Sequence, residues 1–375
     1  MSHPSRFIHH AVEFSYYSGK TRSYLLHKGI PFEERNPKAW GYLLTLPIKV
    51  GAAVVPVLQT PEGSWLQDTS CIIDAMEQRF PQRPMLPAGP VQRLAAYLFE
   101  LWGDEFLLMM AMHTRWNRPE HHDWYAAHAG AVLLPGWPSP MQRWLGGRIG
   151  SQMSGFAATL GFDATQRERL DRFTQIQLDA LDAHFARHAF LFGGRPSLGD
   201  FGLIGPLFAH VGRDPLSRRD LIDPRPALKA WIARMFDPAS AVDGEFLADD
   251  SLPETLLPAL RSIFDEMLPF IAACGQALGS NRKTAAGRTL RFFDRVEFPL
   301  AGGLHRRSAA SYPVWMAQRL LDALASWPEA EQRVARAWLA QVGGEQLLAL
   351  KLPRMARQGL AARVLTPAGA GRHAG

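Results

Sequence analysis

Alternating apolar and polar positions divide the first 85 residues into short strands and helices. Apolar runs predict strands at 11–14, 30–34 and 54–58, and positions 21–28 carry the apolar spacing of a helix. Gly29 follows that helix directly, which is typical of a residue that ends a helix in the left-handed conformation. A hairpin turn at 61–64 leads to a short strand at 65–66, and a second helix follows at 70–80. The order β-α-β-irregular-β-β-α predicts an α/β domain.

Helical spacing dominates after residue 90. It predicts helices at 91–115, 165–189, 197–211 and 226–235, whereas 117–150 is rich in Pro, Gly, Trp and His and predicts an insertion or a long loop. The polar stretch 237–253 indicates a boundary. Beyond it, 256–278 carries a long apolar stripe, 282–307 is basic, and 313–350 is again helical in pattern.

The composition narrows the protein class. Hydrophobic residues make up 47% and charged residues 20% of the 375 positions, which indicates a globular chain with a real core. The net charge of +6 is mild, and no arginine- or lysine-rich arm suggests a nucleic-acid partner. Two cysteines, Cys71 and Cys274, are too few for a disulfide framework or a cysteine-based metal site. No stretch is apolar for long enough to be a signal peptide or a membrane span, so we expect a soluble, cytoplasmic protein with no membrane partner.

Three short motifs stand in order along the predicted elements. The first is the run Ser15-Tyr16-Tyr17-Ser18-Gly19-Lys20-Thr21-Arg22, with Lys28-Gly29-Ile30 downstream. The second joins Val55-Pro56-Val57-Leu58 to Leu66-Gln67-Asp68-Thr69-Ser70-Cys71-Ile72. The third is Gly194-Arg195-Pro196-Ser197-Leu198-Gly199-Asp200, in which Ser197 and Asp200 have the spacing of a helix capping box.

With these motifs, the first 85 residues resemble the thioredoxin-like domain of glutathione transferases, in particular serine-type, zeta- or theta-like members. The next 150 resemble the all-helical domain of that family. The resemblance implies an α/β thioredoxin-like domain at 11–84 and an all-α domain at 90–238. A further helical region at 253–366, which most family members lack, is expected to pack on the helical domain.

The resemblance also implies how a glutathione thiol would be activated. Ser15 stands where the first strand turns into the first helix, so its hydroxyl can donate to the thiolate; alternatively it only caps the helix. The phenol of Tyr17 is a second candidate for thiol activation. Ser18 fits a capping role better, and we also count it among the glutathione contacts. No cysteine occupies this turn, which argues against disulfide-exchange chemistry.

The remaining glutathione contacts come from the second motif and from Lys49 in the irregular segment before it. Pro56 is predicted to follow a cis bond, so that the backbone of Val55 can pair with the peptide like an added strand. Thr69 can donate to the γ-glutamyl carboxylate at a helix N-terminus, and Asp68 can accept from the ammonium; the alternative is a cap pair without a ligand. Lys49 is a candidate for the glycine carboxylate or an ordinary surface lysine.

Polar residues on the long helix after residue 90 form a stripe that we expect to face a cleft or a subunit interface. They include Glu100, Asp104, Glu105 and His113. Glu105 and His113 lie on nearly the same helix face, but the polar stripe is favoured over a metal pair. No metal is predicted.

These observations favour a glutathione transferase-like enzyme, with glutathione as co-substrate. It would conjugate or isomerise a hydrophobic electrophile and form a homodimer. A non-catalytic, metaxin-like interaction protein on the same fold is the alternative, because Lys20 and the pair Tyr24-Leu25 match a pattern of those relatives. The residues leave open which electrophile is used and whether Ser15 or a neighbouring tyrosine activates the thiol.

Overall fold

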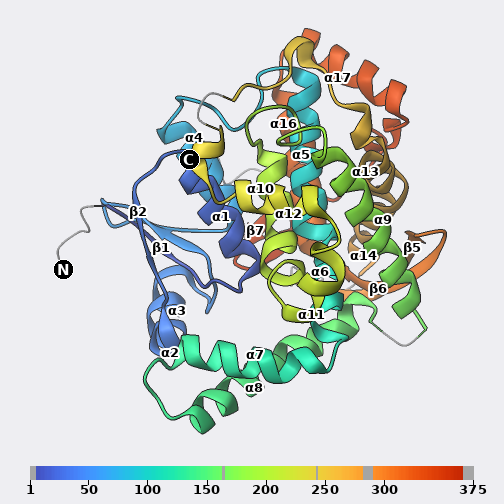
Figure 1. Cartoon of the computed structure of the whole chain (residues 1–375). Helices are drawn as coiled ribbons and strands as arrows, with labels where there is room; N and C mark the ends of the chain where they lie inside the picture. Colours follow the sequence, from blue (N-terminus) through green and yellow to red (C-terminus); the bar gives the residue numbers. More distant parts are fainter. Residues whose placement is uncertain (1–5, 163–164, 242–243, 282–289, 366–375) are drawn as a thin grey trace.

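The structure is a computed structural model that describes residues 6–162, 165–241, 244–281 and 290–365 (Figure 1). The N-terminal domain consists of β1 (Phe7–His10), α1 (Tyr16–His27), β2 (Phe32–Arg35), α2 (Lys38–Trp40), a π-helical turn (Gly41–Thr45), α3 (Leu46–Val50), β3 (Val57–Gln59), β4 (Trp65–Gln67) and α4 (Thr69–Arg79). Its strands form one sheet of order β2-β1-β3-β4. β1 and β2 are parallel and are joined through α1, as a parallel pair requires, and the other neighbours are antiparallel.

The first strand lies at 7–10, so its predicted position at 11–14 is wrong. The polar His9 obscured the pattern, although its ring is fully buried between two partners. Its Nε2 lies 2.7 Å from the Thr21 hydroxyl, and its Nδ1 lies 3.0 Å from Glu34 Oε2. The apolar residues 11–14 form the turn that leads into α1 instead.

The second domain is helical. The helix predicted at 91–115 is α5 (Pro90–Leu101), a π-helical turn (Trp102–Phe106) and α6 (Leu108–Trp116). The other helices of this domain are α7 (Glu120–Leu133), α8 (Ser139–Gly155), α9 (Arg167–Phe185), α10 (Leu198–Pro206), a π-helical turn (Leu207–Val211), α11 (Pro215–Ser217), a second such turn (Arg218–Ile222) and α12 (Pro226–Arg234). The two-domain fold class predicted from the sequence is thus confirmed.

The loop or insertion predicted at 117–150 is in fact the helical hairpin α7–α8. Glycine lowers helix propensity, and its abundance here suggested a loop. Two of these glycines instead let the helix backbones touch: a Cβ on Gly130 would lie 1.9 Å from the Gln142 carbonyl oxygen, and one on Gly146 would lie 2.0 Å from that of Ala126. Close helix packing explains this part of the composition.

The C-terminal region contains two β-hairpins besides the expected helices. In β5, Val296, Phe298 and Leu300 are buried and the residues between them are exposed, which is the period of a strand. The segment 282–289 of the basic stretch lies outside the described residues. The elements are α13 (Leu257–Ser262), a π-helical turn (Ile263–Met267), α14 (Leu268–Ser280), β5 (Phe292–Leu300), β6 (Gly303–Ala310), α16 (Ser311–Ser326), α17 (Glu329–Val342), β7 (Met355–Gln358) and β8 (Ala361–Val364).

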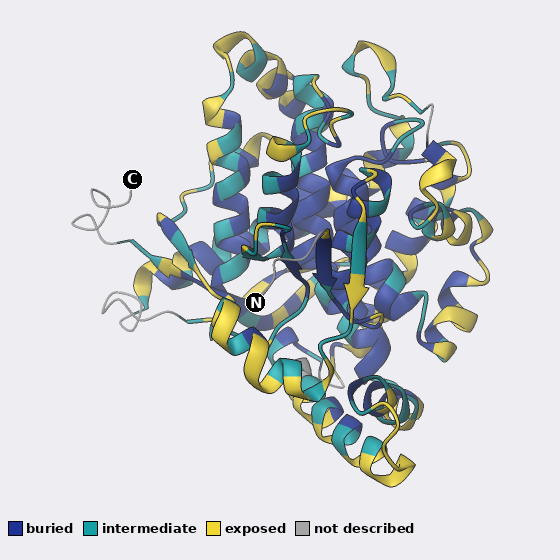
Figure 2. Ribbon diagram, turned by 90° about the vertical axis from the view of Figure 1, so that its left-hand side faces the viewer, coloured by how far each residue is buried: buried dark blue, intermediate teal, exposed yellow. Residues whose placement is uncertain are grey.

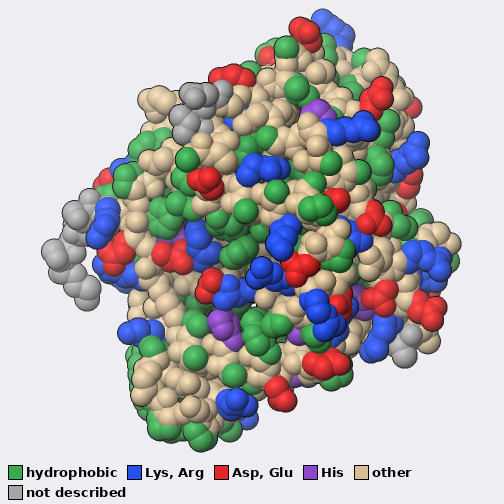
Figure 3. All heavy atoms as spheres, viewed as in Figure 1, with side chains coloured by type: hydrophobic (Ala, Val, Ile, Leu, Met, Phe, Trp, Pro, Cys, Tyr) green, Lys and Arg blue, Asp and Glu red, His purple; other side chains and the backbone are tan. Residues whose placement is uncertain are grey.

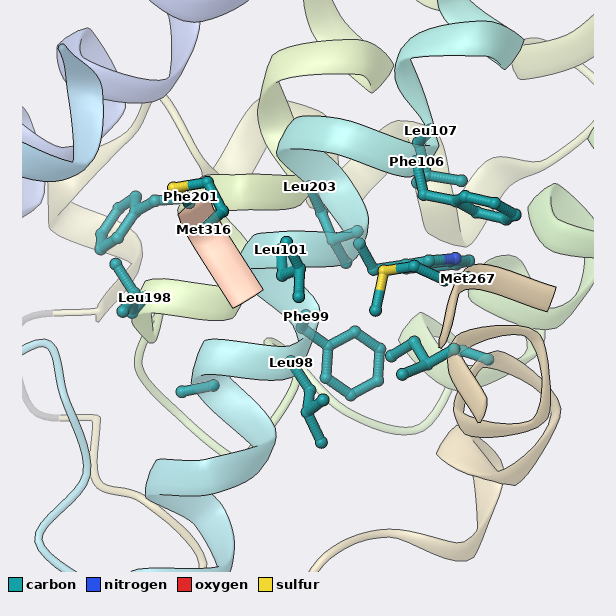
Figure 4. Packing of buried hydrophobic residues seen from close by; sticks show 14 of the residues in the cluster. Leu98, Phe99, Leu101, Phe106, Leu107, Leu198, Phe201, Leu203, Met267 and Met316 are labelled. Atoms are coloured by element: carbon teal, nitrogen blue, oxygen red, sulfur yellow. The ribbon is translucent and has the colours of Figure 1, made fainter. Parts of the chain in front are cut away.

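One apolar core runs through the helical domain and the C-terminal region. The ring of Phe106 lies 5.7 Å from Phe173 of α9, 6.1 Å from Phe270 of α14 and 5.8 Å from Phe298 of β5, measured between centroids. Figure 4 shows Met267 and Met316 of the C-terminal region among the side chains of α5 and α10. Within the described residues, no helix is both long and apolar enough to span a bilayer.

Candidate functional site

The strand register brings three loops to one end of the sheet. His10 at the end of β1 pairs with Val57 at the start of β3, and Val57 pairs with Gln67 at the end of β4. The residues that follow His10, precede Val57 and follow Gln67 therefore meet there. These loops carry Ser15, Val55-Pro56 and Asp68-Thr69, so the register places most of the predicted site residues together.

Ser15 is the N-cap of α1. Its backbone is extended (φ −84°, ψ 127°), and its hydroxyl oxygen accepts a hydrogen bond from the Ser18 N–H at 3.3 Å. The prediction that Ser18 fits the cap better is wrong, because α1 begins at residue 16 rather than at 21. The buried Ser18 hydroxyl instead accepts from the Val12 N–H at 3.4 Å. The Ser15 hydroxyl accepts through its oxygen and retains its own proton for donation.

The two tyrosines after Ser15 point into the helical domain. Tyr16 is buried and donates to the Gly103 carbonyl, whereas the Tyr17 hydroxyl donates to the Asp104 carbonyl at 3.1 Å. Burial raises the pKa of both phenols well above the usual value. Both side chains therefore act as neutral donors to the π-helical turn between α5 and α6.

The loop before β3 has the predicted backbone: the Val55–Pro56 bond is cis. Pro56 is buried and Val55 is half-buried. Lys49, at the end of α3, is exposed, and its ammonium lies 5.9 Å from the centre of the Trp65 ring. The register argument does not place Lys49 beside the other candidates.

Asp68 is held in an unusual conformation at the start of α4. Its φ of +85° lies in the region that L-residues rarely adopt, and its Oδ1 accepts from the Cys71 N–H at 3.0 Å as the N-cap. Such strained backbone positions concentrate at functional sites. Thr69, the first residue of the helix, is only 5% exposed.

Other groups noted in the sequence have structural partners. His113 Nε2 lies 2.8 Å from Asp171 Oδ1. Asp200 accepts from the Ser197 N–H at 2.9 Å, which confirms the capping box. Among the described residues, no group of three His, Cys, Asp or Glu side chains is arranged to hold a metal ion.

Two cavities, of about 490 and 380 Å³, lie away from this end of the sheet. The first is lined mainly by α13, α17 and the linker around residues 250–254, and the second by α7 and residues 208–218. Neither is lined by a predicted site residue.

Comparison with protein families identifies both domains. Residues 10–84 match the family model described as the glutathione S-transferase N-terminal domain, and residues 177–234 match its C-terminal domain. This chain carries both glutathione S-transferase domains. No curated protein matches it.

Several solved structures resemble this chain in fold. A glutathione S-transferase from Rhodospirillum rubrum F11 is 16% identical, with a TM-score of 0.40, over 66% of this chain and 96% of the other. A glutathione S-transferase-like protein from Pseudomonas syringae is 20% identical, with a TM-score of 0.42, over 63% and 68%. A glutathione S-transferase from Methylobacterium radiotolerans in complex with glutathione sulfonate is 20% identical, with a TM-score of 0.38, over 65% and 98%.

The residues beyond the matched family domains reach the candidate site. The Tyr312 hydroxyl of α16 donates to Asp68 Oδ2, and Arg357 of β7 donates to Gln67 Oε1 at 2.6 Å. Sequence reasoning missed both contacts. Nothing in the local sequence around Tyr312 relates it to a residue 244 positions away.

Charged groups from all three regions meet beside the site. The fully buried Lys20 ammonium of α1 lies 2.8 Å from Glu100 and 2.5 Å from Asp104. Arg319 of α16 contacts the other oxygen of Glu100 at 2.6 Å and also binds Asp74. The polar stripe predicted on α5 therefore faces α1 and the C-terminal region of the same chain.

The pKa values of the acids in this network shift in opposite directions. Burial raises the pKa of Asp104 to about 7, although Lys20 opposes the shift. Glu100 is equally buried, but it has two cationic partners, Arg319 and Lys20, which lower its pKa to about 2. The pKa of the neighbouring Glu105 is also raised well above its usual value by burial.

The C-terminal region also contributes the buried Arg307. Its guanidinium lies 4.5 Å from the centre of the Phe270 ring, and burial lowers its pKa to about 10. Its Nε and one terminal nitrogen have no hydrogen-bond partner among the described residues. The Glu105 carboxylate acts in the opposite direction to burial and raises the pKa of Arg307.

Proposed function

We propose that this protein binds glutathione at the sheet end formed by Ser15, Val55 and Asp68, and that it stabilises the thiolate for attack on, or isomerisation of, a hydrophobic electrophile. The observation that carries the proposal is the strand pairing of His10 with Val57 and of Val57 with Gln67. This register brings the N-termini of α1 and α4 and the loop at Val55 to the same end of the sheet. Together they match the charges and the peptide backbone of glutathione.

The N-terminus of α1 suits a thiolate. A helix N-terminus carries about half a positive charge, and a free thiol with a pKa near 8.5 needs such stabilisation to ionise at neutral pH. The Ser15 hydroxyl is the donor we assign to the sulfur, as in a serine-type member. The Tyr17 phenol is already committed to the Asp104 carbonyl and has a raised pKa, which favours Ser15 over Tyr17.

The N-terminus of α4 suits the other end of the peptide. The first N–H groups of the helix, together with the Thr69 hydroxyl, can receive the γ-glutamyl carboxylate, and Asp68 can receive the ammonium. Val55 supplies backbone groups for the cysteine residue, because its N–H forms none of the hydrogen bonds found among the described residues. Lys49 is assigned to the glycine carboxylate.

A non-catalytic binding protein is the second candidate, and a specific contact favours it. Tyr312 already donates to Asp68, and Thr69 is 5% exposed, so the C-terminal region covers the proposed γ-glutamyl end. If that cover stays in place, the site remains closed to glutathione and the fold serves another partner. The proposal for the enzyme also includes a homodimer and a cytoplasmic location, both from the family resemblance.

Calorimetric titration with glutathione separates the two candidates. We expect the wild type to bind and Thr69→Val to bind roughly 5- to 150-fold more weakly, because a buried acceptor on the ligand loses its partner. Thr45→Val, at an exposed position on the turn before α3, is the matched control and should bind like the wild type.

Tyr312→Phe then tests the cover. If the wild type fails to bind at millimolar glutathione but Tyr312→Phe binds, the site exists and is closed by the C-terminal region, which supports the second candidate. If neither binds, the glutathione site itself is refuted. If the protein binds glutathione, thiolate absorbance measured against pH shows which hydroxyl donates to the sulfur. Ser15→Ala should raise the pKa of the bound glutathione thiol more than Tyr17→Phe does.

A further inference from the structure

Large hydrophobic side chains are exposed on one part of the molecule. Seven of them lie on two short segments, 40–48 and 137–144, and the most exposed are Ile48 at 77% and Trp40 at 68%. Figure 2 shows exposed helix faces at the bottom of the molecule, and in Figure 3 hydrophobic side chains gather at the lower left, near α2, α3 and the α7–α8 hairpin. We call this set the lower apolar surface; its members are Trp40, Leu43, Leu44, Ile48, Trp137, Met141 and Trp144.

The two segments are neighbours. The Asn36 side chain donates to the Val132 carbonyl at the end of α7, and Tyr42 packs into a small core that includes Tyr125 of α7. α8 packs along α7 through the close backbone contact at Gly146. The two segments that carry the lower apolar surface therefore both pack against α7.

The apolar positions are oriented outward by packing on the opposite side. Residues 40, 43, 44 and 48 have helical spacing, while Leu46 between them is fully buried. On α8, Gly146 and Gly150 face α7 and its surroundings, which leaves Met141 and Trp144 toward solvent. A rearrangement that buried these side chains would have to break both contacts.

The charged side chains within the two segments that carry this surface have one sign. The sequence has no Asp or Glu from 35 to 61 or from 124 to 162, although 35 acids in 375 residues would place about six there. The cations within these segments are exposed, and Arg148 lies 5.8 Å from the centre of the Trp144 ring. They are Arg35, Lys38, Lys49, Arg143 and Arg148. The surface is therefore both apolar and positively charged.

This combination fits a lipid surface better than a second copy of the chain. Tryptophan is favoured at the membrane–water boundary, and helices with an apolar face and lysine or arginine beside it lie in the interface of anionic bilayers. A two-fold contact between copies would instead set the same cations against one another, without any acid to pair with them.

We propose that the lower apolar surface docks on an anionic lipid bilayer, with residues 38–50 and α8 lying in the headgroup region. The apolar side chains enter the boundary with the acyl chains, and the arginines bind lipid phosphates. The protein lies on the membrane without crossing it. This inference departs from the sequence-based expectation of no membrane partner. It shares Lys49 with the proposed glutathione site, but its test does not require glutathione.

Co-sedimentation of the full chain with vesicles tests the proposal. We expect binding to vesicles made of equal parts phosphatidylglycerol and phosphatidylcholine, weaker binding to pure phosphatidylcholine, and loss of the difference in high salt. The double variant Trp40→Ser/Trp144→Ser should bind at least about tenfold more weakly. Arg143→Gln and Arg148→Gln should each weaken binding about fivefold to the anionic vesicles alone.

The control is Ile176→Ser/Leu257→Ser, which removes two exposed apolar residues elsewhere, 45% and 39% exposed, and should bind like the wild type. The proposal is overturned if the wild type does not bind anionic vesicles, or if it binds both vesicle types equally. A dimer that dissociates in the tryptophan variant, without vesicle binding by the wild type, would assign the surface to a second copy instead. Unchanged circular dichroism of the variants verifies that they fold.

Discussion

Replacing Lys20 by methionine removes one positive charge from the buried network between the domains. The Lys20 ammonium is completely buried, 2.8 Å from Glu100, 2.5 Å from Asp104 and 3.3 Å from the Ser70 hydroxyl. Methionine has a similar length and is apolar, so the substitution deletes the charge with little loss of volume. Glu100 keeps its contact with Arg319, whereas Asp104 is left without a cation.

The expected cost follows from that asymmetry. Removing one partner of a buried ion pair costs about 3–5 kcal/mol, because the other charge stays buried and uncompensated. Asp104 can avoid the cost by taking up a proton, and its pKa is already raised to about 7 in the wild type. The loss in the free energy of unfolding should therefore be largest at pH 8 and smaller at pH 6.

Urea denaturation followed by tryptophan fluorescence at both pH values measures this loss. Arg22→Met is the control on the same helix: Arg22 pairs with Glu34 at 2.6 Å, but the Glu34 side chain is 33% exposed, so about 1 kcal/mol or less is expected. Adding Asp104→Asn to Lys20→Met should recover much of the lost stability, since no unpaired charge remains. The reasoning fails if Lys20→Met costs no more than Arg22→Met, or if its cost is larger at pH 6 than at pH 8.

Two further predictions concern the same interdomain region. Burial raises the pKa of Asp104 from 3.8 to about 7, so between these pH values the folded protein binds a proton that the unfolded chain has lost, and the free energy of unfolding falls as pH rises through this window. Asp104→Asn should reduce this pH dependence of the free energy of unfolding by up to about 4 kcal/mol. Urea denaturation midpoints from pH 4 to 8 measure the change. Phe298→Ala should destabilise the protein by about 3–5 kcal/mol, because this ring is 1% exposed and packs on Phe106 and Phe270, whereas Leu304→Ala on the same hairpin, 62% exposed, should change stability by less than about 0.5 kcal/mol. An Asp104→Asn protein as pH-dependent as the wild type, or equal effects of the two hairpin variants, would contradict these assignments.

Sequence reasoning succeeded where a feature depends on neighbouring residues. Gly29 has φ +70° at the end of α1, as its position after a helical run predicts. The Ser197–Asp200 capping box forms within one helical turn. The Val55–Pro56 bond is cis, as the family resemblance implied. Turn chemistry and capping are local, so a short stretch of sequence determines them.

Sequence reasoning failed where burial or close packing gives a residue a structural role that its type alone does not suggest. His9 looked too polar for a strand, yet Thr21 and Glu34 satisfy its ring inside the fold. The glycines of α7 and α8 suggested a loop, yet they permit backbone contact between helices. Both errors arose because the sequence gives the type of each residue but not the residues that contact it in the fold.

The sequence by itself determined the order of the four strands and of α1 and α4 in the N-terminal domain, and the three loops that carry the candidate site. It did not show α2 and α3, which form in the segment predicted to be irregular. Only the tertiary structure decided that Tyr312 reaches Asp68, that Arg319 joins the buried charges around Lys20, and that the C-terminal region shares its core with the helical domain. Local propensity and hydrogen bonding specify the first group within a few residues. The second group depends on which apolar faces pack together across more than two hundred residues, and that choice is made by the shape of the whole core.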